Sequence, residues 1–198
     1  MESLILRPRR DLWVPRAVPR DARRLQLPHY LAGDCASGDT LAAFGPAANQ
    51  PPATNYAALF VRNGHLVLAF DTTTQQTAIF SGVMPRNYAG GGLTVFAAWM
   101  AASAVTGTIG WDITFERMNA ANHDLDADAF ATAQTITAAT VDATSGKVTV
   151  TSVAITAGAA GTDSLAAGDA FRLRIRRDVA NDTAAGDAHL LSVEIKET

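Results

Sequence analysis

The chain has 198 residues, 48% of them hydrophobic, which suits one well-buried domain with an appendage and is short for two full domains. The net charge of −3 is unevenly distributed: residues 1–24 carry seven arginines against three acids, and residues 25–198 carry nine basic residues against sixteen acids. The single cysteine, Cys35, excludes an intrachain disulfide and a cysteine-rich zinc site. The apolar runs are far below the ~20 residues that span a bilayer, and the N-terminus does not read as a signal peptide. We therefore expect a soluble protein that is made in the cytoplasm and does not bind a membrane.

The N-terminal segment is rich in proline and arginine. Residues 1–52 contain seven of the eight prolines, and proline lacks an amide donor and restricts its predecessor to extended geometry, so this segment should be extended or looped. It also contains too many large apolar side chains to remain in water. We expect it to lie against its own domain, a neighbouring copy or another protein, and we predict a docking arm over residues 1–55 and a β domain over residues 56–198.

The β domain reads as a series of strands. Asn63-Gly64 is typical of a type I′ turn and predicts a hairpin, and apolar residues alternate with polar ones in several later segments. A shift of the apolar phase between Val150 and Val153 suggests a β-bulge near Ser152. The nine predicted strands are Ala57–Arg62, His65–Phe70, Gln76–Val83, Leu93–Met100, Ile109–Glu116, Gln134–Ala138, Lys147–Thr156, Ala170–Arg177 and Ala188–Lys196. This all-β pattern predicts an antiparallel β-sandwich, with a jelly roll of about eight strands as the leading topology.

The sequence offers no convincing catalytic or cofactor site, and we expect a protein that is not an enzyme, with no metal ligands and no cofactor. The four histidines lie far apart, and neither a nucleophile motif nor a pair of carboxylates suited to glycoside hydrolysis stands out. Asp124, Asp126 and Asp128 resemble the start of a calcium loop, but Ala129 and Thr135 occupy the positions at which an EF-hand needs glycine and glutamate. The remaining alternatives are a solvated acidic loop and a looser surface calcium site.

Three arginines on one predicted strand form the first candidate interface. Arg172, Arg174 and Arg176 alternate with apolar residues and therefore point to the same side of the strand. They could bind an anionic surface, a neighbour rich in carboxylates or a phosphate backbone. The alternative is a solvated outer face, partly paired with Glu194 on a neighbouring strand, where such pairs contribute little stability.

The arm supplies the second candidate interface. Guanidinium groups make bidentate contacts with carboxylates and phosphates, and tryptophan and arginine dominate protein interfaces. Docking to another protein is favoured over nucleic acid, because tails that bind nucleic acid are usually denser in basic residues and poorer in proline and leucine. Packing against the protein's own domain remains open. The candidate residues are Arg7, Arg9, Arg10, Trp13, Arg16, Arg20, Arg23 and Arg24.

One stretch of the β domain, MPRNYAGGGLTVFAAW, leads from a Met-Pro pair through an Asn-Tyr pair and glycines into a strand that bears a tryptophan. The residues of this pattern are Met84, Pro85, Asn87, Tyr88, Gly91, Leu93 and Trp99. Together with the closing DAHLLSVEIKE, it resembles small jelly-roll proteins of tailed-phage virions, over roughly residues 56–198. The resemblance implies a head decoration or cement protein, a head fibre or a tail-associated binding module. The arm does not match this pattern.

These observations favour a non-enzymatic protein that decorates or cements a phage capsid. Its arm would bind the major capsid protein or another virion protein, and its β-sandwich would self-associate, as a homotrimer because capsid lattices offer threefold positions. The alternative is a receptor- or carbohydrate-binding module of a phage tail or fibre. That alternative predicts an exposed aromatic platform built from Trp99, Trp111 or Tyr88, although Trp111 alternates in phase with core residues.

Overall fold

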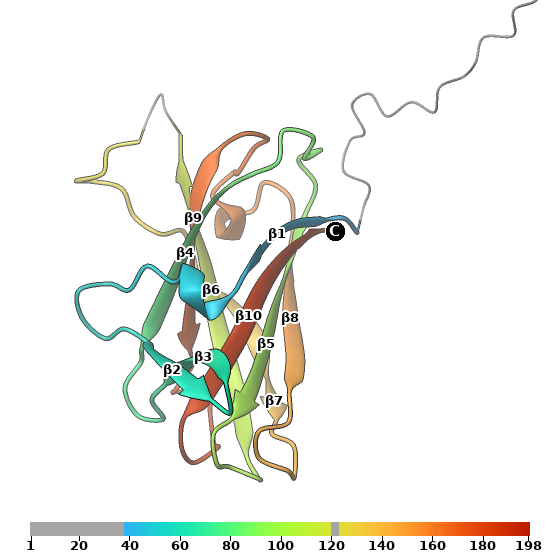
Figure 1. Ribbon diagram of the computed structural model, residues 1–198. Coiled ribbons are helices and arrows are strands. Elements are labelled where there is room, and N and C mark those ends of the chain that lie inside the picture. The colour runs from blue at the N-terminus through green and yellow to red at the C-terminus, as the bar shows by residue number, and fades with distance from the viewer. Residues whose placement is uncertain (1–37, 120–122) are drawn as a thin grey trace, which may run out of the picture. The chain divides into compact units, whose positions relative to one another are not determined.

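The structure is a computed structural model that describes residues 38–119 and 123–198 (Figure 1). Chain contacts divide the protein into Met1–Ala32 and Gly33–Thr198, and the described residues all lie in the second unit. Its elements are β1 (Thr40–Phe44), the 3-10 helix η1 (Pro46–Ala48), β2 (Ala58–Arg62), β3 (His65–Phe70), β4 (Thr77–Val83), β5 (Leu93–Ala101), β6 (Thr108–Met118), β7 (Gln134–Thr140), β8 (Thr149–Ile155), the 3-10 helix η2 (Ala160–Thr162), β9 (Ala170–Arg177) and β10 (Ala188–Glu197). Within this part of the chain, no helix has the length and apolar character that crossing a bilayer requires.

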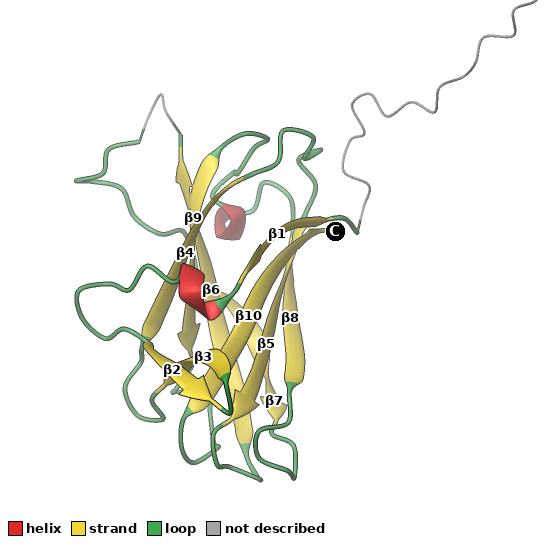
Figure 2. Ribbon diagram, in the orientation of Figure 1, coloured by secondary structure: helices red, strands yellow, loops and turns green. Residues whose placement is uncertain are grey.

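The strands form two antiparallel sheets that face each other (Figure 2). Sheet A has the order β2-β3-β10-β5-β8, with β1 also paired to β10, and sheet B has the order β4-β9-β6-β7. From β3 to β10 the chain passes from one sheet to the other at every connection except the one between β6 and β7. Eight strands in this order form a jelly roll. The predicted antiparallel β-sandwich with jelly-roll topology is therefore confirmed.

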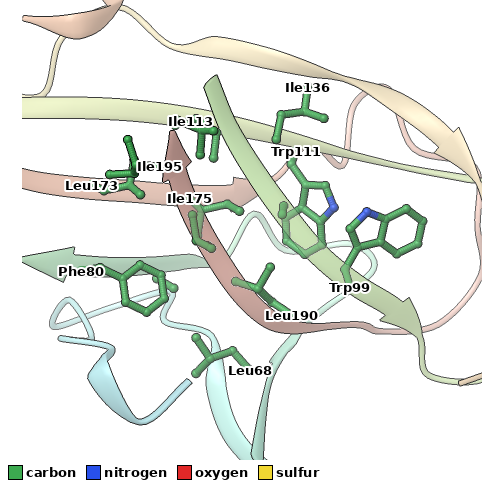
Figure 3. Close-up of a cluster of buried hydrophobic side chains, with 14 of the residues drawn as sticks. Leu68, Phe80, Trp99, Trp111, Ile113, Ile136, Leu173, Ile175, Leu190 and Ile195 are labelled. Carbon is green, nitrogen blue, oxygen red and sulfur yellow. The ribbon is translucent and has the colours of Figure 1, made fainter. Parts of the chain in front are cut away.

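The core lies between the sheets and comes from the inward half of each alternating strand. On β6, Trp111 and Ile113 are fully buried, and on β5 Trp99 is fully buried. The ring centroids of Trp99 and Trp111 lie 6.4 Å apart, and Phe70 packs edge-on against Trp111 at 5.0 Å. Figure 3 shows the two indole rings beside Leu190 and Ile136. The expectation that Trp111 belongs to the core is confirmed.

All nine predicted strands are present, with ends that differ by at most two residues, but the structure adds β1, within the predicted arm. β1 pairs with the second half of β10, and Leu41 is buried in the core. The amide of Gln50 donates to the carbonyl of Ile79 on β4 at 2.7 Å. The sandwich therefore includes Thr40–Phe44, which the sequence analysis had placed in the arm of residues 1–55. Prolines did not prevent this strand, because Pro46 lies after it, in the first turn of η1, where a missing amide costs nothing.

Two local predictions have different outcomes. Asn63 and Gly64 both have positive φ, 47° and 80°, which confirms the type I′ turn between β2 and β3. The bulge suggested near Ser152 is wrong, because β8 pairs with β5 in unbroken register from Thr149 to Ile155. The apolar phase shift arises because Val150 lies on the outer face of sheet A and is 60% exposed.

Candidate functional site

The last strand of sheet A, β2, exposes apolar side chains on both of its faces. Leu59 and Val61 are each 57% exposed, and Phe60 is 49% exposed. Leu59 is in register with the core residue Leu68 of β3, so Leu59 and Val61 point to the core side and Phe60 points outward. We call Ala58–Val61 and the 44% exposed Leu66 of β3 the β2 edge.

The position of β2 explains this exposure. The eight jelly-roll strands lie four against four, and β2 lies one strand further out, at the border of sheet A (Figure 1). Among the described strands it pairs with β3 alone, so the backbone groups along its other border have no strand partner. Edge strands are commonly protected by charges, prolines or bulges, and the sequence of Ala58–Val61, ALFV, has none of these. An exposed apolar strand border of this kind is a candidate association surface.

Contacts on the outer face hold the β2–β3 hairpin against the body of sheet A. The ring of Phe60 lies 5.6 Å from that of His189 on β10, centroid to centroid. The Nη1 atom of Arg62 donates to the carbonyl of Ala101 at 3.2 Å and lies 3.4 Å from Nδ1 of His189. The β2 edge is therefore presented by an anchored hairpin.

The buried histidine beneath this hairpin predicts a loss of stability in acid. Burial lowers the pKa of His189 below its usual value of 6.5, and the positive charge of Arg62 lowers it further. The folded protein therefore binds a proton at His189 more weakly than the unfolded chain does. Above pH 6.5 the imidazole is neutral in both states and costs no stability. As the pH falls through 6.5 towards the folded pKa, the unfolded chain takes up the proton first and the free energy of unfolding decreases. We expect His189→Gln to flatten the loss of unfolding free energy between about pH 7 and pH 5, measured by urea denaturation. The exposed His65 supplies the control, since His65→Gln should keep the dependence of the unchanged protein. Equal slopes for the two variants would contradict the prediction.

The three arginines of β9 lie on the outer face of sheet B, opposite polar residues of β6. Arg172 Nε lies 2.6 Å from a carboxylate oxygen of Glu116, and Arg176 lies 3.4 Å from Asp112. Arg174 Nε donates to the hydroxyl of Thr114 at 2.9 Å. The structure thus brings the three predicted residues together and gives them partners on β6.

The expected pairing with Glu194 is wrong. Glu194 lies on β10 in sheet A, where its carboxylate accepts a hydrogen bond from Thr40 of β1. The neighbours of β9 are β4 and β6, both in sheet B. Alternation along a strand predicts which residues share a face, but strand order decides which residues oppose them.

This arginine face retains positive charge. Among the described residues no carboxylate pairs with Arg174, and the ring of Phe130 lies over the guanidinium groups of Arg174 and Arg172, at 4.4 and 5.0 Å. Burial and the neighbouring charge of Arg176 lower the pKa of Arg174. A hollow of about 350 Å³ lies beside Arg174, Arg176 and Phe130 and extends to Thr77 on β4. The face is suited to an anionic group, and its use as an interface stays a prediction.

The other predicted site residues have two outcomes. The arm residues Arg7, Arg9, Arg10, Trp13, Arg16, Arg20, Arg23 and Arg24 lie outside the described residues. Trp99, Trp111 and Tyr88, the expected contributors to an aromatic platform, are all buried. An exposed platform built from these three residues is therefore excluded.

The acidic loop after β6 does not gather its three aspartates. Asp124 accepts a hydrogen bond from the amide of Asp126 at 3.0 Å, which is a local turn contact. Asp128 instead lies with Glu116 and His123, and these three side chains are a possible set of metal ligands among the described residues. The sequence analysis assigned no metal ligand, and sequence spacing gave no signal for a set that joins a strand to a loop.

No protein-family model and no curated protein matches the sequence. Several solved structures are similar in shape. The CBM22-1 xylan-binding domain of Xyn10C from Paenibacillus barcinonensis is 13% identical, with a TM-score of 0.46, over 82% of this chain and 96% of that one. The CBM22-1–GH10 modules of xylanase 10B from Clostridium thermocellum are 15% identical, with a TM-score of 0.44, over 82% of this chain and only 28% of that one. A structure of infectious bursal disease virus, Gt strain, is 13% identical, with a TM-score of 0.33, over 86% of this chain and 35% of that one.

These likenesses are too weak to carry an argument about function. The jelly-roll assignment rests on the strand order of the two sheets. The candidate surfaces are the β2 edge, which the sequence analysis missed, and the arginine face, which it named as one of two candidate interfaces. The sequence of the β2 edge carries no charge, which could have drawn attention to it. An uncharged apolar run is equally typical of a strand buried on both sides, so it did not predict exposure.

Proposed function

We propose that this protein is a non-enzymatic structural protein of a phage virion, which docks on the capsid surface through its N-terminal arm and self-associates through its β-sandwich. The observation that carries the proposal is the β2 edge, because an unpaired apolar strand is a binding surface for another protein. The sequence resemblance to jelly-roll virion proteins supports the virion setting. The opposite charges of arm and body, seen in the sequence, support attraction between neighbouring copies.

A second copy of this chain is the occupant that suits the β2 edge. Pairing along β2 would satisfy the free backbone groups of both strands. It would also remove Leu59, Val61 and Phe60 from water in each copy. No charge lies within Ala58–Val61 to oppose such pairing. Two β2 edges that pair with each other leave no free strand border for a third copy, so this contact gives a dimer. The homotrimer expected from the sequence needs a further contact between copies.

The alternative of a receptor- or carbohydrate-binding module is less well supported. It relied on an aromatic platform, and the three aromatic residues named for it are buried. The non-enzymatic part of the proposal rests on the sequence, in which no nucleophile motif and no suitable carboxylate pair was found.

Co-sedimentation with capsid shells that lack this protein tests the proposed function. We expect the full chain to pellet with the shells and to saturate at a fixed number of copies per shell, because a lattice offers equivalent positions. Shells stripped of their other surface proteins serve as the second sample, to identify the major capsid protein as the partner. A full chain that stays in the supernatant at every concentration would overturn the proposal.

Charges placed on the β2 edge should disrupt self-association. We expect the double variant Leu59→Lys, Val61→Lys to weaken self-association at least about tenfold, because it buries charges against an apolar partner strand. Both positions are exposed, so the fold should be retained. Analytical ultracentrifugation of the unchanged chain should give at least twice its mass of 20.8 kDa, and three times that mass if a further contact completes a trimer.

Val150→Lys is the matched control, since Val150 is an exposed valine on β8 at the other end of sheet A. It should assemble as the unchanged chain does. If the unchanged chain is a monomer at micromolar concentration, or if both variants assemble equally well, the β2 edge is not the self-association surface.

A further inference from the structure

Three possible metal ligands converge at one end of sheet B. Glu116 lies near the end of β6, and His123 and Asp128 lie in the segment that follows it. One carboxylate oxygen of each acid and one ring nitrogen of the histidine all lie within 4.8 Å of one another. A strand residue and two loop residues thus present donor atoms to the same point.

The histidine of this cluster is buried, and one of its ring nitrogens lacks a partner. The side chain of His123 is only 10% exposed, and among the described residues its Nε2 has no hydrogen-bond partner. Its Nδ1 does lie against the carboxylate of Asp128. A buried ring nitrogen without a hydrogen bond is costly, and a metal ion that accepts its lone pair would remove that cost.

The surroundings leave room for an ion. A hollow of about 320 Å³ is lined by His123 and Asp128, together with Arg117, Asn119, Asp163 and Ser164. Its lining is mainly polar, so water molecules can complete the coordination of a metal held by three protein ligands. Arg172 is bonded to one carboxylate oxygen of Glu116, so a metal would take the other oxygen.

The donor set indicates the kind of metal. Calcium and magnesium prefer ligand sets made of oxygen atoms, whereas an imidazole with two carboxylates suits zinc and other first-row divalent ions. Ligand atoms around a tetrahedral zinc lie about 3.4 Å apart, as bond lengths of about 2.1 Å require. The spacing of up to 4.8 Å therefore needs only a small closure of the loop.

We propose that Glu116, His123 and Asp128 bind one zinc ion per chain. The ion ties the acidic loop to β6. Phe130, two residues after Asp128, lies over Arg172 and Arg174. Zinc therefore fixes the segment that covers the arginine face. This site does not depend on the proposed capsid role.

Zinc titration of the full chain, stripped with a chelator, tests the site. Isothermal titration calorimetry should show one zinc per chain, and melting should shift to higher temperature with added zinc. Calcium and magnesium at the same concentration should leave the melting temperature unchanged. His123→Ala and Asp128→Asn should each raise the dissociation constant at least about tenfold, because each removes one of three ligands.

Two matched variants complete the experiment. His65→Ala removes an exposed histidine far along the chain, and Asp126→Asn removes a carboxylate of the same loop outside the cluster. Both should bind zinc as the unchanged chain does. Asp128→Asn keeps the test informative if His123→Ala fails to fold. The proposal is overturned if the unchanged chain binds no stoichiometric zinc, or if the control variants lose as much affinity as the cluster variants.

Discussion

Replacing Arg177 by methionine is expected to lower the free energy of unfolding by about 3–5 kcal/mol, because it strands a buried carboxylate. Arg177 is the last residue of β9 and is fully buried. Its Nε lies 2.6 Å from Asp182, whose side chain is only 3% exposed. Methionine is also a flexible unbranched side chain but carries no charge, so Asp182 would remain buried without its partner.

The same guanidinium also joins two segments of backbone through three carbonyl groups. It donates to the carbonyl of Phe70 at 3.2 Å, of Ala184 at 3.1 Å and of Gly186 at 2.8 Å. Phe70 ends β3, and the other two carbonyls belong to the connection between β9 and β10. Arg177 therefore links sheet B to the first strand of the jelly roll, and its loss leaves carbonyls as well as a carboxylate unsatisfied.

Arg176→Met is the control, because Arg176 is the neighbouring arginine on the outer face and lies 3.4 Å from Asp112. Its replacement should cost less than about 1 kcal/mol, as expected of a partly exposed pair. Urea denaturation of both variants measures the difference. Adding Asp182→Asn to Arg177→Met should recover part of the loss, since the stranded charge is removed. Equal midpoints for the two single variants would contradict the role of Arg177.

Deleting residues 1–32 is expected to reduce shell binding at least about a hundredfold while leaving the sandwich folded. The deleted segment contains all eight candidate arm residues, seven arginines and Trp13. Arginine and tryptophan are the residue types that contribute most to protein interfaces. The remaining chain, Gly33–Thr198, keeps β1 and its pairing with β10. A deletion to residue 55 would confuse docking with folding, because it would remove that strand.

Co-sedimentation with shells measures the binding, and urea denaturation checks that the shortened chain is as stable as the full one. A second full-length variant, with the seven arm arginines changed to lysine, separates charge from geometry. Lysine keeps the charge but lacks the bidentate fork, so we expect weaker binding than with arginine. Shell binding that is unchanged after the deletion would show that the arm is not the anchor, and attention would pass to the arginine face of sheet B.

Period-two alternation was enough to locate nine strands and to predict a sandwich. It succeeded because one face of each strand must be apolar when two sheets enclose a core. The turn at Asn63-Gly64 was predictable for a similarly local reason, since few residue pairs accept two positive φ angles. Thr40–Phe44 was missed because its pairing with β10 joins residues about 150 positions apart, and nearby prolines suggested an irregular segment.

The candidate functional features depend on the tertiary structure. The uncharged sequence of Ala58–Val61 is typical of a buried strand, and only the strand order makes it an exposed border. Arg177 shares the inward phase of β9 with core residues, but its partner comes from a loop whose path the alternation does not describe.

The same distinction holds for the possible metal ligands and for the arginine face. The spacing of Glu116, His123 and Asp128 along the sequence matches no metal-binding motif. The fold alone brings their donor atoms together. Alternation along a strand is local geometry, so the residues of Ala170–Arg177 that point the same way could be predicted from the sequence. The residues that lie opposite these arginines are distant in the sequence, because they belong to whichever strand pairs with β9. Strand order is a property of the whole fold, so only the tertiary structure shows that this strand is β6.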